Sequence, residues 1–368
     1  MPGTAPNHLD NLLDYDRAGL RQWFVEHKQS AFRADQLLKW MYHQQQTDFA
    51  AMSNLGKDLR SWLQQHAEIR PPVITDEQLS SDGTVKWLFD VGAGNAIETV
   101  FIPETHRGTL CVSSQVGCAL NCSFCATGAQ GFNRNLSTAE IIGQVWQAAR
   151  RLGHQRNGRR RITNVVMMGM GEPLLNMSAL LPALRLMNED LAFGLAGRRV
   201  TVSTAGLVPA IDKLAAAVDV SLAVSLHAAD DALRNELVPL NRKYPIEQLL
   251  AACARYGNGR SKRSVTYEYT MIDGVNDQTE HARSLIALLQ RVPGKVNLIP
   301  FNPFPGSSYR CSPLRTIENF QQMLMTAGFI ATVRRTRGQD IDAACGQLAG
   351  DFMDRTTRRE RIRLQVAV

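Results

Sequence analysis

Short β-rich runs alternate with helical stretches from about residue 109 to about residue 334, and this alternation constrains the fold more than any other feature. It is typical of a parallel sheet, because the chain has to cross over between two parallel strands and usually does so as a helix. The expected strands are residues 109–112, 162–168, 199–203, 220–226, 265–271, 295–300 and 330–334. The expected helices include residues 139–152, which follow Ser137 and Glu140 in capping-box spacing, and residues 279–290.

Six or seven strand–helix units within about 230 residues predict an incomplete barrel of about six units, because a complete barrel of eight units takes around 250 residues. An open, doubly wound α/β sheet is the alternative arrangement of the same pattern. In both folds the carboxyl ends of the strands form the functional edge, so residues directly after the strands are candidate site residues.

Two other segments precede this α/β part. Apolar residues at helical spacing predict a small helical domain, and Pro71-Pro72 mark its end because two prolines cannot continue a helix. Short extended runs separated by turn signals then predict an antiparallel β element. We therefore expect four segments: the helical domain at 1–72, the β element at 73–103, the α/β core at 104–345 and a C-terminal tail at 346–368.

Composition and charge narrow the class of protein. Hydrophobic residues make up 44% and charged residues 20% of the chain, which excludes a disordered protein. The 41 Lys and Arg against 34 Asp and Glu give a net charge of +7, which favours a polyanionic partner. Much of the positive charge lies in clusters: Arg150-Arg151, Arg156, Arg159-Arg160-Arg161, Arg242-Lys243, Arg260-Lys262-Arg263 and Arg334-Arg335-Arg337. Each cluster fits RNA phosphates and a solvated surface equally well.

No window approaches the roughly 18 apolar residues of a membrane helix, and no basic segment followed by an apolar stretch opens the chain, so we expect a cytoplasmic protein without a membrane partner. Four of the seven cysteines lie within fifteen residues, which indicates metal ligation or thiol chemistry rather than a disulfide scaffold. Cys253 and Cys311 are expected to be small buried apolar residues.

Cys118, Cys122 and Cys125 form the sharpest motif, directly after the first strand of the parallel series. A structural zinc site usually takes four ligands in two cysteine pairs, so a zinc site here needs Cys111 or His106 as a further ligand. Alternatively, three thiolates bind three irons of a cubane cluster and leave the fourth iron open. The spacing CxxxCxxC resembles the signature of the radical S-adenosylmethionine (SAM) superfamily, in which the open iron of a 4Fe–4S cluster binds SAM and electron transfer cleaves it to a 5′-deoxyadenosyl radical.

Further candidate residues follow the later strands. Gly171 allows close approach of a ligand to the backbone, and Glu172 offers a carboxylate to an ammonium group. These two residues resemble the GEP motif of the superfamily, which binds the SAM amino group. Resemblance also implies that the SAM ribose, carboxylate and adenine are contacted by Ser203, Ser225, Leu226, His227 and Asn302. Each of these residues alone also fits a cap or turn.

Cys345 follows the final strand, after an arginine cluster and beside a glycine, where a thiolate is stabilised and accessible. With its surroundings, DIDAACGQL, the resemblance narrows to the RlmN and Cfr type of RNA adenine methyltransferases. It covers essentially the whole chain: the helical N-terminal domain, the antiparallel element, CALNCSFCATG, GMGEP, VSTAG, SLHA, IPFNP and DIDAACGQL. This family uses two cysteines outside the cluster, which match Cys345 and Cys111.

The resemblance implies a ping-pong reaction with two SAM molecules per turnover. A ring carbon of adenine has no lone pair to attack a methylsulfonium, so polar methyl transfer fails there. In this family one SAM methylates the residue that matches Cys345, and a radical from the second SAM removes a hydrogen from that methyl group. The carbon radical adds to the ring, and a base, for which Glu98 matches the family position, removes the ring proton. Cys111 then forms a disulfide with Cys345 and frees the product.

The implied activity is methylation of C2 of an adenosine in the peptidyl transferase centre of 23S rRNA and of the adenosine next to the anticodon in tRNA. A reducing protein such as flavodoxin and a monomeric state are also implied. Cfr-type methylation of C8 of the same rRNA adenosine uses the same motifs and is the nearest alternative. More remote alternatives are an RNA-binding protein with a structural zinc and a radical SAM enzyme that acts on a small molecule.

Overall fold

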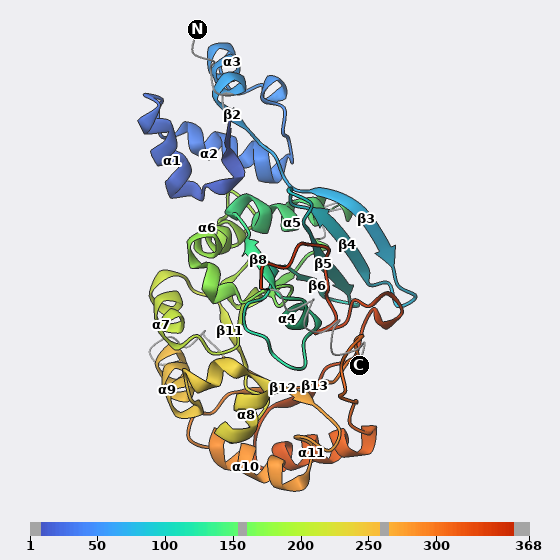
Figure 1. The fold of residues 1–368 in the computed structure, drawn as a ribbon. Helices are drawn as coiled ribbons and strands as arrows, with labels where there is room; N and C mark the ends of the chain where they lie inside the picture. Colours follow the sequence, from blue (N-terminus) through green and yellow to red (C-terminus); the bar gives the residue numbers. More distant parts are fainter. Residues whose placement is uncertain (1–8, 154–159, 258–264, 357–368) are drawn as a thin grey trace.

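The computed structural model describes residues 9–153, 160–257 and 265–356. Its main element is a ten-stranded mixed sheet in the order β14-β13-β12-β11-β10-β9-β6-β5-β4-β3 (Figure 1). The parallel strands are β6 (Gly108–Cys111), β9 (Asn164–Met167), β10 (Val200–Thr204), β11 (Ser221–Ser225), β12 (Val265–Met271), β13 (Lys295–Pro300) and β14 (Ala331–Val333). The helices along this part of the chain are α4 (Ala126–Gln130), α5 (Thr138–Arg151), α6 (Met177–Asn188), α7 (Val208–Ala217), α8 (Asp231–Leu237), α9 (Ile246–Gly257), α10 (Thr279–Leu289) and α11 (Leu314–Thr326).

Each strand from β9 to β14 pairs with the parallel strand that precedes it in the sequence. The sheet is therefore wound in one direction, whereas a doubly wound sheet reverses direction about a central strand. Strands β14 and β3 form the two edges, so the sheet does not close. The predicted partial barrel of six β/α units is confirmed, with β14 as an added strand, and the doubly wound alternative is wrong.

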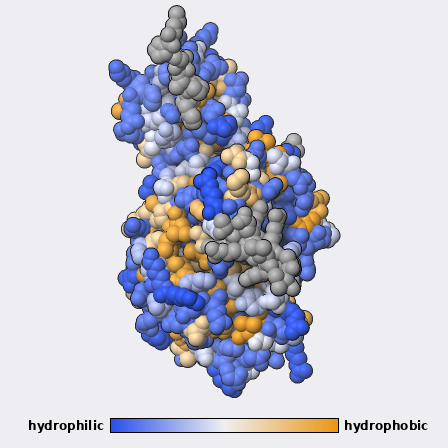
Figure 2. Space-filling view, in the orientation of Figure 1, coloured by the Kyte–Doolittle hydropathy of each residue, from blue (hydrophilic) through white to orange (hydrophobic). Residues whose placement is uncertain are grey.

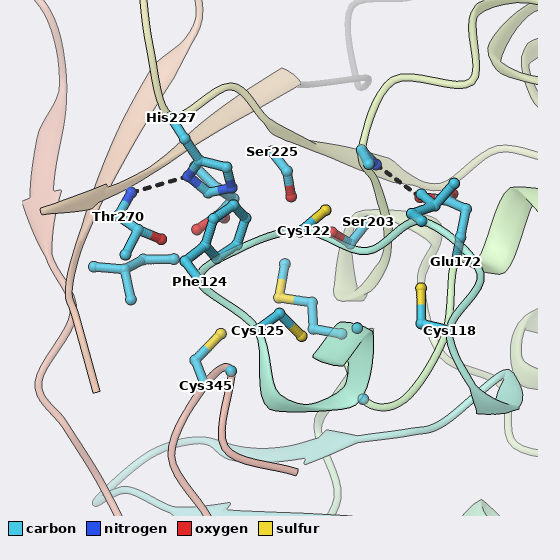
Figure 3. A pocket seen from close by; sticks show the side chains of 18 of the residues that line it. Cys118, Cys122, Phe124, Cys125, Glu172, Ser203, Ser225, His227, Thr270 and Cys345 are labelled. Carbon is cyan, nitrogen blue, oxygen red and sulfur yellow. Dashed lines mark hydrogen bonds between the residues drawn. The ribbon is translucent and has the colours of Figure 1, made fainter. Parts of the chain in front are cut away.

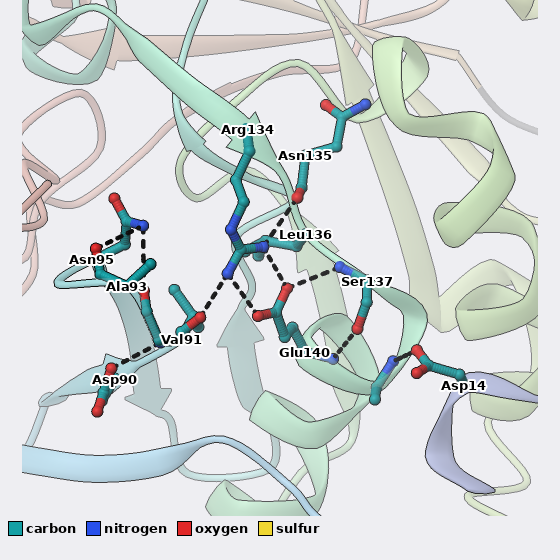
Figure 4. Close-up of polar contacts among 12 residues, drawn as sticks. Asp14, Asp90, Val91, Ala93, Asn95, Arg134, Asn135, Leu136, Ser137 and Glu140 are labelled. Carbon is teal, nitrogen blue, oxygen red and sulfur yellow. Dashed lines mark hydrogen bonds and ion pairs between the residues drawn. The ribbon is translucent and has the colours of Figure 1, made fainter. Parts of the chain in front are cut away.

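The start of α5 shows how local sequence fixes an element (Figure 4). Ser137 accepts a hydrogen bond from the amide of Glu140, and the Glu140 carboxylate accepts one from the amide of Ser137, which is the predicted capping box. The Glu140 carboxylate also pairs with Arg134 at 2.7 Å, and Arg134 donates to the carbonyl of Val91. These contacts connect helix α5 to the preceding strand, β8 (Phe132–Asn135), and to the antiparallel element.

The antiparallel element extends the main sheet. It consists of β3 (Val73–Leu79), β4 (Val85–Asp90) and β5 (Ala96–Pro103), and β5 pairs with β6 with Val100 opposite Cys111. Residues 97–101 of β5 are all buried, as expected for a strand that is covered on both faces.

The N-terminal domain contains α1 (Arg17–Glu26), α2 (Arg33–Leu38) and α3 (Lys57–His66), in agreement with the predicted helices. Two short parallel strands that the sequence did not predict, β1 (Asp10–Asn11) and β2 (Ala67–Glu68), pair its two ends. The domain packs on α5 and α6 (Figure 1), and its buried apolar residues belong to the same cluster as those of the sheet. Its surface is mostly hydrophilic in the view of Figure 2. In the parts of the chain that the structure describes, no helix is both long enough and apolar enough to span a bilayer.

Specific hydrogen bonds fix this domain to the core. The Asp14 carboxylate accepts from the amide of Ala139 at 2.7 Å, at the start of α5. The Trp146 indole of α5 donates to the carbonyl of Met41 at 2.7 Å. Arg185 of α6 pairs with Asp16 at 3.0 Å.

The segment after β14 runs to the opposite edge of the sheet, where it lies near the ends of β3 and β4 (Figure 1). The Ser80 hydroxyl donates to the Asp340 carboxylate at 2.5 Å, and the amide of Gly338 donates to the Asp82 carboxylate at 3.1 Å. Farther along, Asp351 pairs with Ala96 of β5 by an isolated antiparallel bridge. A loop rather than a pair of strands therefore connects the two edges.

Candidate active site

A pocket at the carboxyl ends of the parallel strands brings together most of the predicted site residues (Figure 3). The predicted residues that line it are Cys118, Cys122, Cys125, Gly171, Glu172, Ser203, Ser225, His227, Asn302 and Cys345. Apolar side chains such as Leu120, Phe124 and Phe301 line it as well. Leu226, Cys111 and Glu98 do not line it.

The three motif cysteines lie on the loop that follows β7 (Gln115–Gly117) and are half-buried. Burial raises the pKa of the Cys122 thiol well above its usual value, and the neighbouring Cys118 and Cys125 raise it further. Three thiolates at this position therefore need a bound cation, as an iron–sulfur cluster provides.

The surroundings of the thiols bear on the zinc alternative. Within the described ranges, no three His, Cys, Asp or Glu side chains are arranged to hold a single metal ion. Thiolates that bind separate irons of a cubane lie farther apart than ligands of one ion. His106 is exposed and lines a different cavity with Arg107, and Cys111 is absent from the lining of the cysteine pocket. The zinc site completed by either residue is therefore wrong.

Glu172 is buried at the end of β9, with both carboxylate oxygens held by backbone amides. Oε2 accepts from Ala205 at 2.7 Å and Oε1 from Leu174 at 3.1 Å. Burial raises the pKa of Glu172 to about 7 in spite of these two hydrogen bonds. Gly171 before it has φ +97°, and a Cβ there would collide with the Gln115 side chain. Glycine is thus required at this turn.

His227 presents one hydrogen-bond donor to the pocket. Its Nδ1 accepts from the amide of Thr270 at 3.0 Å, and its ring contacts that of Phe124 with centroids 4.2 Å apart (Figure 3). Burial lowers the pKa of His227 to about 3, so the ring is neutral and the proton lies on Nε2. That Nε2 is buried and has no hydrogen-bond partner among the described residues.

The remaining strand-end residues differ in how they reach the pocket. Ser203 and Ser225 line it directly, from β10 and β11. The Asn302 amide donates to the carbonyl of Cys345 at 3.1 Å, so it also holds the Cys345 loop. Leu226 is fully buried, and its backbone rather than its side chain faces neighbouring polar groups: its amide donates to the carbonyl of Glu268 at 3.0 Å.

Cys345 and Cys111 are both free thiols near the guanidinium of Arg334. Cys345 lines the pocket, and its loop is joined to the cysteine motif by a hydrogen bond from the amide of Ala126 to the carbonyl of Gly346. Cys111 lies on β6 and is 7% exposed. Burial raises the pKa of the Cys111 thiol to about 12, while Arg334 acts to lower it. Cys345 raises the pKa of the Cys111 thiol as well, but less than burial does. Burial also raises the pKa of the Cys345 thiol, and Arg334 acts to lower it.

Glu98 lies on β5 beside β6, on the same face of the sheet as Cys111, because Val100 is the partner of Cys111 and strand residues two apart share a face. Its Oε1 is 3.1 Å from Nζ of Lys86, and its Oε2 accepts from the amide of Ala349 at 2.9 Å. The carboxylate therefore lies behind the loop that follows Cys345.

Three charged residues near the pocket were not identified from the sequence as site residues. Glu268 lines the pocket from β12, and burial raises its pKa to about 7. A carboxylate in the middle of an apolar strand was the signal for it. Arg334 belonged to a predicted surface cluster, but it lines a small cavity with Cys345. Arg234 of α8 is fully buried, and nothing in its local sequence distinguishes it from an arginine on an exposed helix face.

Of the residues in the other predicted arginine clusters, some contact side chains of the protein itself and others are exposed to solvent. Arg150 lies over the Trp146 ring, and Arg151 pairs weakly with Glu77 at 3.9 Å. Arg335 is exposed. The clusters also contain residues that lie outside the described part of the chain: Arg156, Arg159, Arg260, Lys262 and Arg263.

Of the two cysteines expected to be structural, Cys253 is 1% exposed in α9, as predicted. Cys311 is exposed, so that expectation was wrong. It lies in an irregular segment and pairs with Ile272 only through an isolated bridge.

Comparisons with known proteins show the family to which the chain belongs. Residues 10–69 match the family described as the ribosomal RNA large subunit methyltransferase N-terminal domain, and residues 112–286 match the radical SAM superfamily. The chain is 57% identical to the dual-specificity RNA methyltransferase RlmN of Xanthomonas campestris pv. campestris (strain 8004), with 98% of this chain and 93% of the relative covered. Its identity to the enzyme of the same name from Stenotrophomonas maltophilia (strain K279a) is also 57%, with the same coverage.

A crystal structure of a radical SAM methyltransferase from Sphaerobacter thermophilus is similar over nearly the whole molecule. It has a TM-score of 0.85 and 46% sequence identity, and the match covers 92% of this chain and 99% of that one. The chain belongs to the RlmN family of radical SAM RNA methyltransferases, enzymes that use a 4Fe–4S cluster and S-adenosylmethionine.

Proposed function

We propose that this enzyme methylates C2 of an adenosine in the peptidyl transferase centre of 23S rRNA and of the adenosine next to the anticodon in tRNA. The observation that carries the proposal is a single pocket lined by Cys118, Cys122, Cys125 and a fourth thiol, Cys345. A radical SAM enzyme without a covalent methyl carrier has no need of that fourth thiol. The high identity to relatives named as dual-specificity RNA methyltransferases supports two classes of RNA substrate.

Cys118, Cys122 and Cys125 are the proposed ligands of the cluster, and the strand ends are the proposed SAM site. When bound, the cluster and SAM supply a methyl group and a radical that abstracts hydrogen. Glu172 accepts the N–H groups of the SAM amino group, beside the open backbone of Gly171. The proposed contacts with the rest of SAM are Ser203, Ser225, the Leu226 backbone, the Nε2–H of His227 and Asn302.

Two thiols and one carboxylate carry the proposed chemistry on the RNA. Cys345 accepts the methyl group as a thioether and holds the methylene bridge to the adenine ring. Glu98 accepts the ring proton. The ring adduct also has to give up one electron, for which the bound cluster would be the acceptor. Cys111, as its thiolate, then attacks the sulfur of Cys345. The bond between this sulfur and the methylene carbon breaks, its electron pair passes to the methylene carbon, which takes up a proton and becomes the methyl group, and the two sulfurs end as a disulfide. Arg334 lies near both sulfurs and favours their thiolate forms.

The finer statements on partners belong to the same proposal. A one-electron donor such as flavodoxin supplies the reducing electron, and the enzyme works as a monomer in the cytoplasm, where both RNAs are found. The exposed Arg335, near the Cys345 loop in sequence, is suited to contact RNA phosphates.

The decisive test is a reaction with defined RNA. Protein purified and reconstituted with iron and sulfide under anaerobic conditions is incubated with SAM, a reductant and unmodified 23S rRNA or tRNA, and the nucleosides are identified by mass spectrometry. We expect 2-methyladenosine from both RNAs. Finding 8-methyladenosine instead contradicts the proposed position and indicates a Cfr-type reaction. Cluster formation without any methylated nucleoside contradicts the proposed substrates and leaves an enzyme that acts on another molecule.

A further inference from the structure

Arg234 is a buried cation to which the proposed reaction gives no role. It lies on α8 and is fully buried. Its guanidinium donates four hydrogen bonds: to the carbonyl of Leu226 at 3.0 Å, to Oδ1 of Asn241 at 2.6 Å, to the carbonyl of Ala205 at 2.8 Å and to that of Ser225 at 2.9 Å. All four acceptors are neutral oxygens. Burying a charge beside neutral partners alone is costly, so a counter-charge is expected nearby.

Candidates for that counter-charge on α8 or beside it are the Asp231 carboxylate and the cysteine motif. The Asp231 carboxylate is reached only through Asn241, whose amide donates to it at 2.8 Å. Cys122 packs against the apolar cluster that includes Ala205 and Leu237, and the amide of Ser123 donates to the carbonyl of Leu237 at 3.2 Å, so the cysteine motif lies against the helix that carries Arg234. Burial lowers the pKa of Arg234 to about 10, which still leaves the guanidinium charged at neutral pH.

The hydrogen bonds of Arg234 join two neighbouring strand ends. Ser225 is the last residue of β11, Leu226 follows it, and Ala205 follows β10. Ser225 and Ala205 also line the pocket, and Ala205 donates its amide to the Glu172 carboxylate. One rigid guanidinium fork thus fixes the backbone that carries the proposed SAM contacts.

We propose that Arg234 is a positioning residue with two effects: its fork fixes the ends of β10 and β11 for SAM, and its charge offsets the negative charge of the cluster held at Cys122. This inference rests on the proposed function, in which Cys118, Cys122 and Cys125 hold the cluster. Three thiolates outweigh the charge of an oxidised cubane core, so the site is already anionic before reduction. One added electron makes it more negative. A buried cation beside it therefore raises the reduction potential.

Three variants separate charge from geometry. Arg234→Gln removes the charge and keeps two N–H donors, whereas Arg234→Lys keeps the charge and loses the fork. Arg255→Gln is the matched control, because Arg255 is exposed on α9 and pairs with Asp212 at 2.9 Å. Each reconstituted protein is checked for iron and sulfide content and for its circular dichroism spectrum. The midpoint potential is then measured by redox titration with electron paramagnetic resonance, and SAM binding by equilibrium dialysis.

We expect Arg234→Gln to shift the midpoint potential to more negative values, and Arg234→Lys and the control to keep it near that of the wild type. We expect Arg234→Lys to weaken SAM binding at least tenfold, because the three donors of an ammonium start from one nitrogen and cannot reach the carbonyls that Nε and Nη2 of Arg234 reach from separate positions. An unchanged potential in Arg234→Gln overturns the electrostatic effect. Wild-type SAM affinity in Arg234→Lys overturns the positioning effect.

A fourth protein keeps the test decisive if Arg234→Gln does not hold a cluster. The double variant Asp231→Asn, Asn241→Asp exchanges an amide and a carboxylate and places the negative charge directly against Arg234. It has to lower the potential as well, and an unchanged potential again overturns the electrostatic effect. Wild-type protein that binds no cluster contradicts the proposed function itself, and this outcome is distinct from a failure of the inference about Arg234.

Discussion

The backbone amide of Ala349 donates a hydrogen bond of 2.9 Å to the carboxylate of Glu98, and so joins the loop after Cys345 to strand β5. The other carboxylate oxygen lies 3.1 Å from Nζ of Lys86. These two contacts hold the carboxylate between the loop after Cys345 and strand β4. If Glu98 is the base, proton removal from the substrate and the position of the Cys345 loop are coupled.

Replacing Glu98 by Gln tests its role as base. The amide oxygen still accepts a hydrogen bond from Ala349, so the loop should stay in place, but the ring proton has no acceptor. We expect the single-turnover rate of product formation to fall by at least about 100-fold. Hydrogen exchange of residues 346–350 should stay close to that of the wild type. Glu104→Gln, at an exposed carboxylate paired with Arg107, is the control, and equal rates for both variants would assign the proton to another group.

Cys345→Ala should abolish methylation and leave the cluster intact. The substitution removes the proposed methyl acceptor, whereas the three proposed iron ligands stay unchanged. Iron and sulfide analysis and mass spectrometry of the nucleosides check the two parts. Residual 2-methyladenosine would mean that the methyl group reaches the ring without this thiol.

Cys111→Ala should trap a covalent adduct between protein and RNA, because no second thiol remains to attack the sulfur of Cys345. A band of higher mass in denaturing electrophoresis, sensitive to ribonuclease, detects it. Cys253→Ala is the matched control, since Cys253 is also buried but lies in α9, outside the lining of the pocket. Normal turnover of Cys111→Ala without an adduct would exclude the disulfide step.

The raised pKa of Glu172 predicts that the affinity for SAM depends on pH. Burial raises its pKa from 4.5 to about 7, and N–H groups of the SAM amino group prefer the ionised form. The ionised fraction rises with pH, so the ratio of the SAM affinity of the wild type to that of Glu172→Gln should rise between pH 6 and pH 8. Equilibrium dialysis of both proteins measures the ratio, which cancels the titration of SAM itself. A ratio that stays flat would show that Glu172 does not contact the amino group.

The lowered pKa of Asp82 predicts that its contact with Gly338, in the segment after β14, weakens in acid. Partial burial opposes ionisation, but hydrogen bonds from Thr84, Gly338 and Ser80 outweigh it and lower the pKa from 3.8 to about 2. A carboxyl group whose pKa is lower in the folded than in the unfolded chain stabilises the fold at pH values above its unfolded pKa of 3.8. This stabilisation is lost as the pH falls from 3.8 toward 2. At pH 7, Asp82→Asn should reduce the free energy of unfolding by about 1 kcal/mol, after allowance for solvent screening. Urea unfolding of both proteins at pH 7 and pH 3 checks that the difference shrinks in acid.

The sequence predicted the seven parallel strands to within two residues at each end, because their apolar runs and the helices between them are strongly periodic. It also predicted most of the pocket, because strand-end residues meet at one edge in any fold of this class. It did not predict the pairing of β1 with β2, since two-residue strands carry no periodicity. Nor did it separate Arg334 and Arg234 from surface arginines. Which charges face inward depends on contacts between distant segments, and such contacts leave no local pattern.

The loop between the two edges of the sheet has a mechanical consequence. Ten strands are joined by ladders of hydrogen bonds, but between β14 and β3 the link passes through single contacts such as those of Ser80 with Asp340 and Asp82 with Gly338. Each such contact contributes only about 1 kcal/mol, far less than a ladder. We therefore expect these single contacts between the segment after β14 and the β3 edge to break before any strand pair of the sheet separates. A shift of the Cys345 loop along this connection would therefore leave every strand pair of the sheet intact.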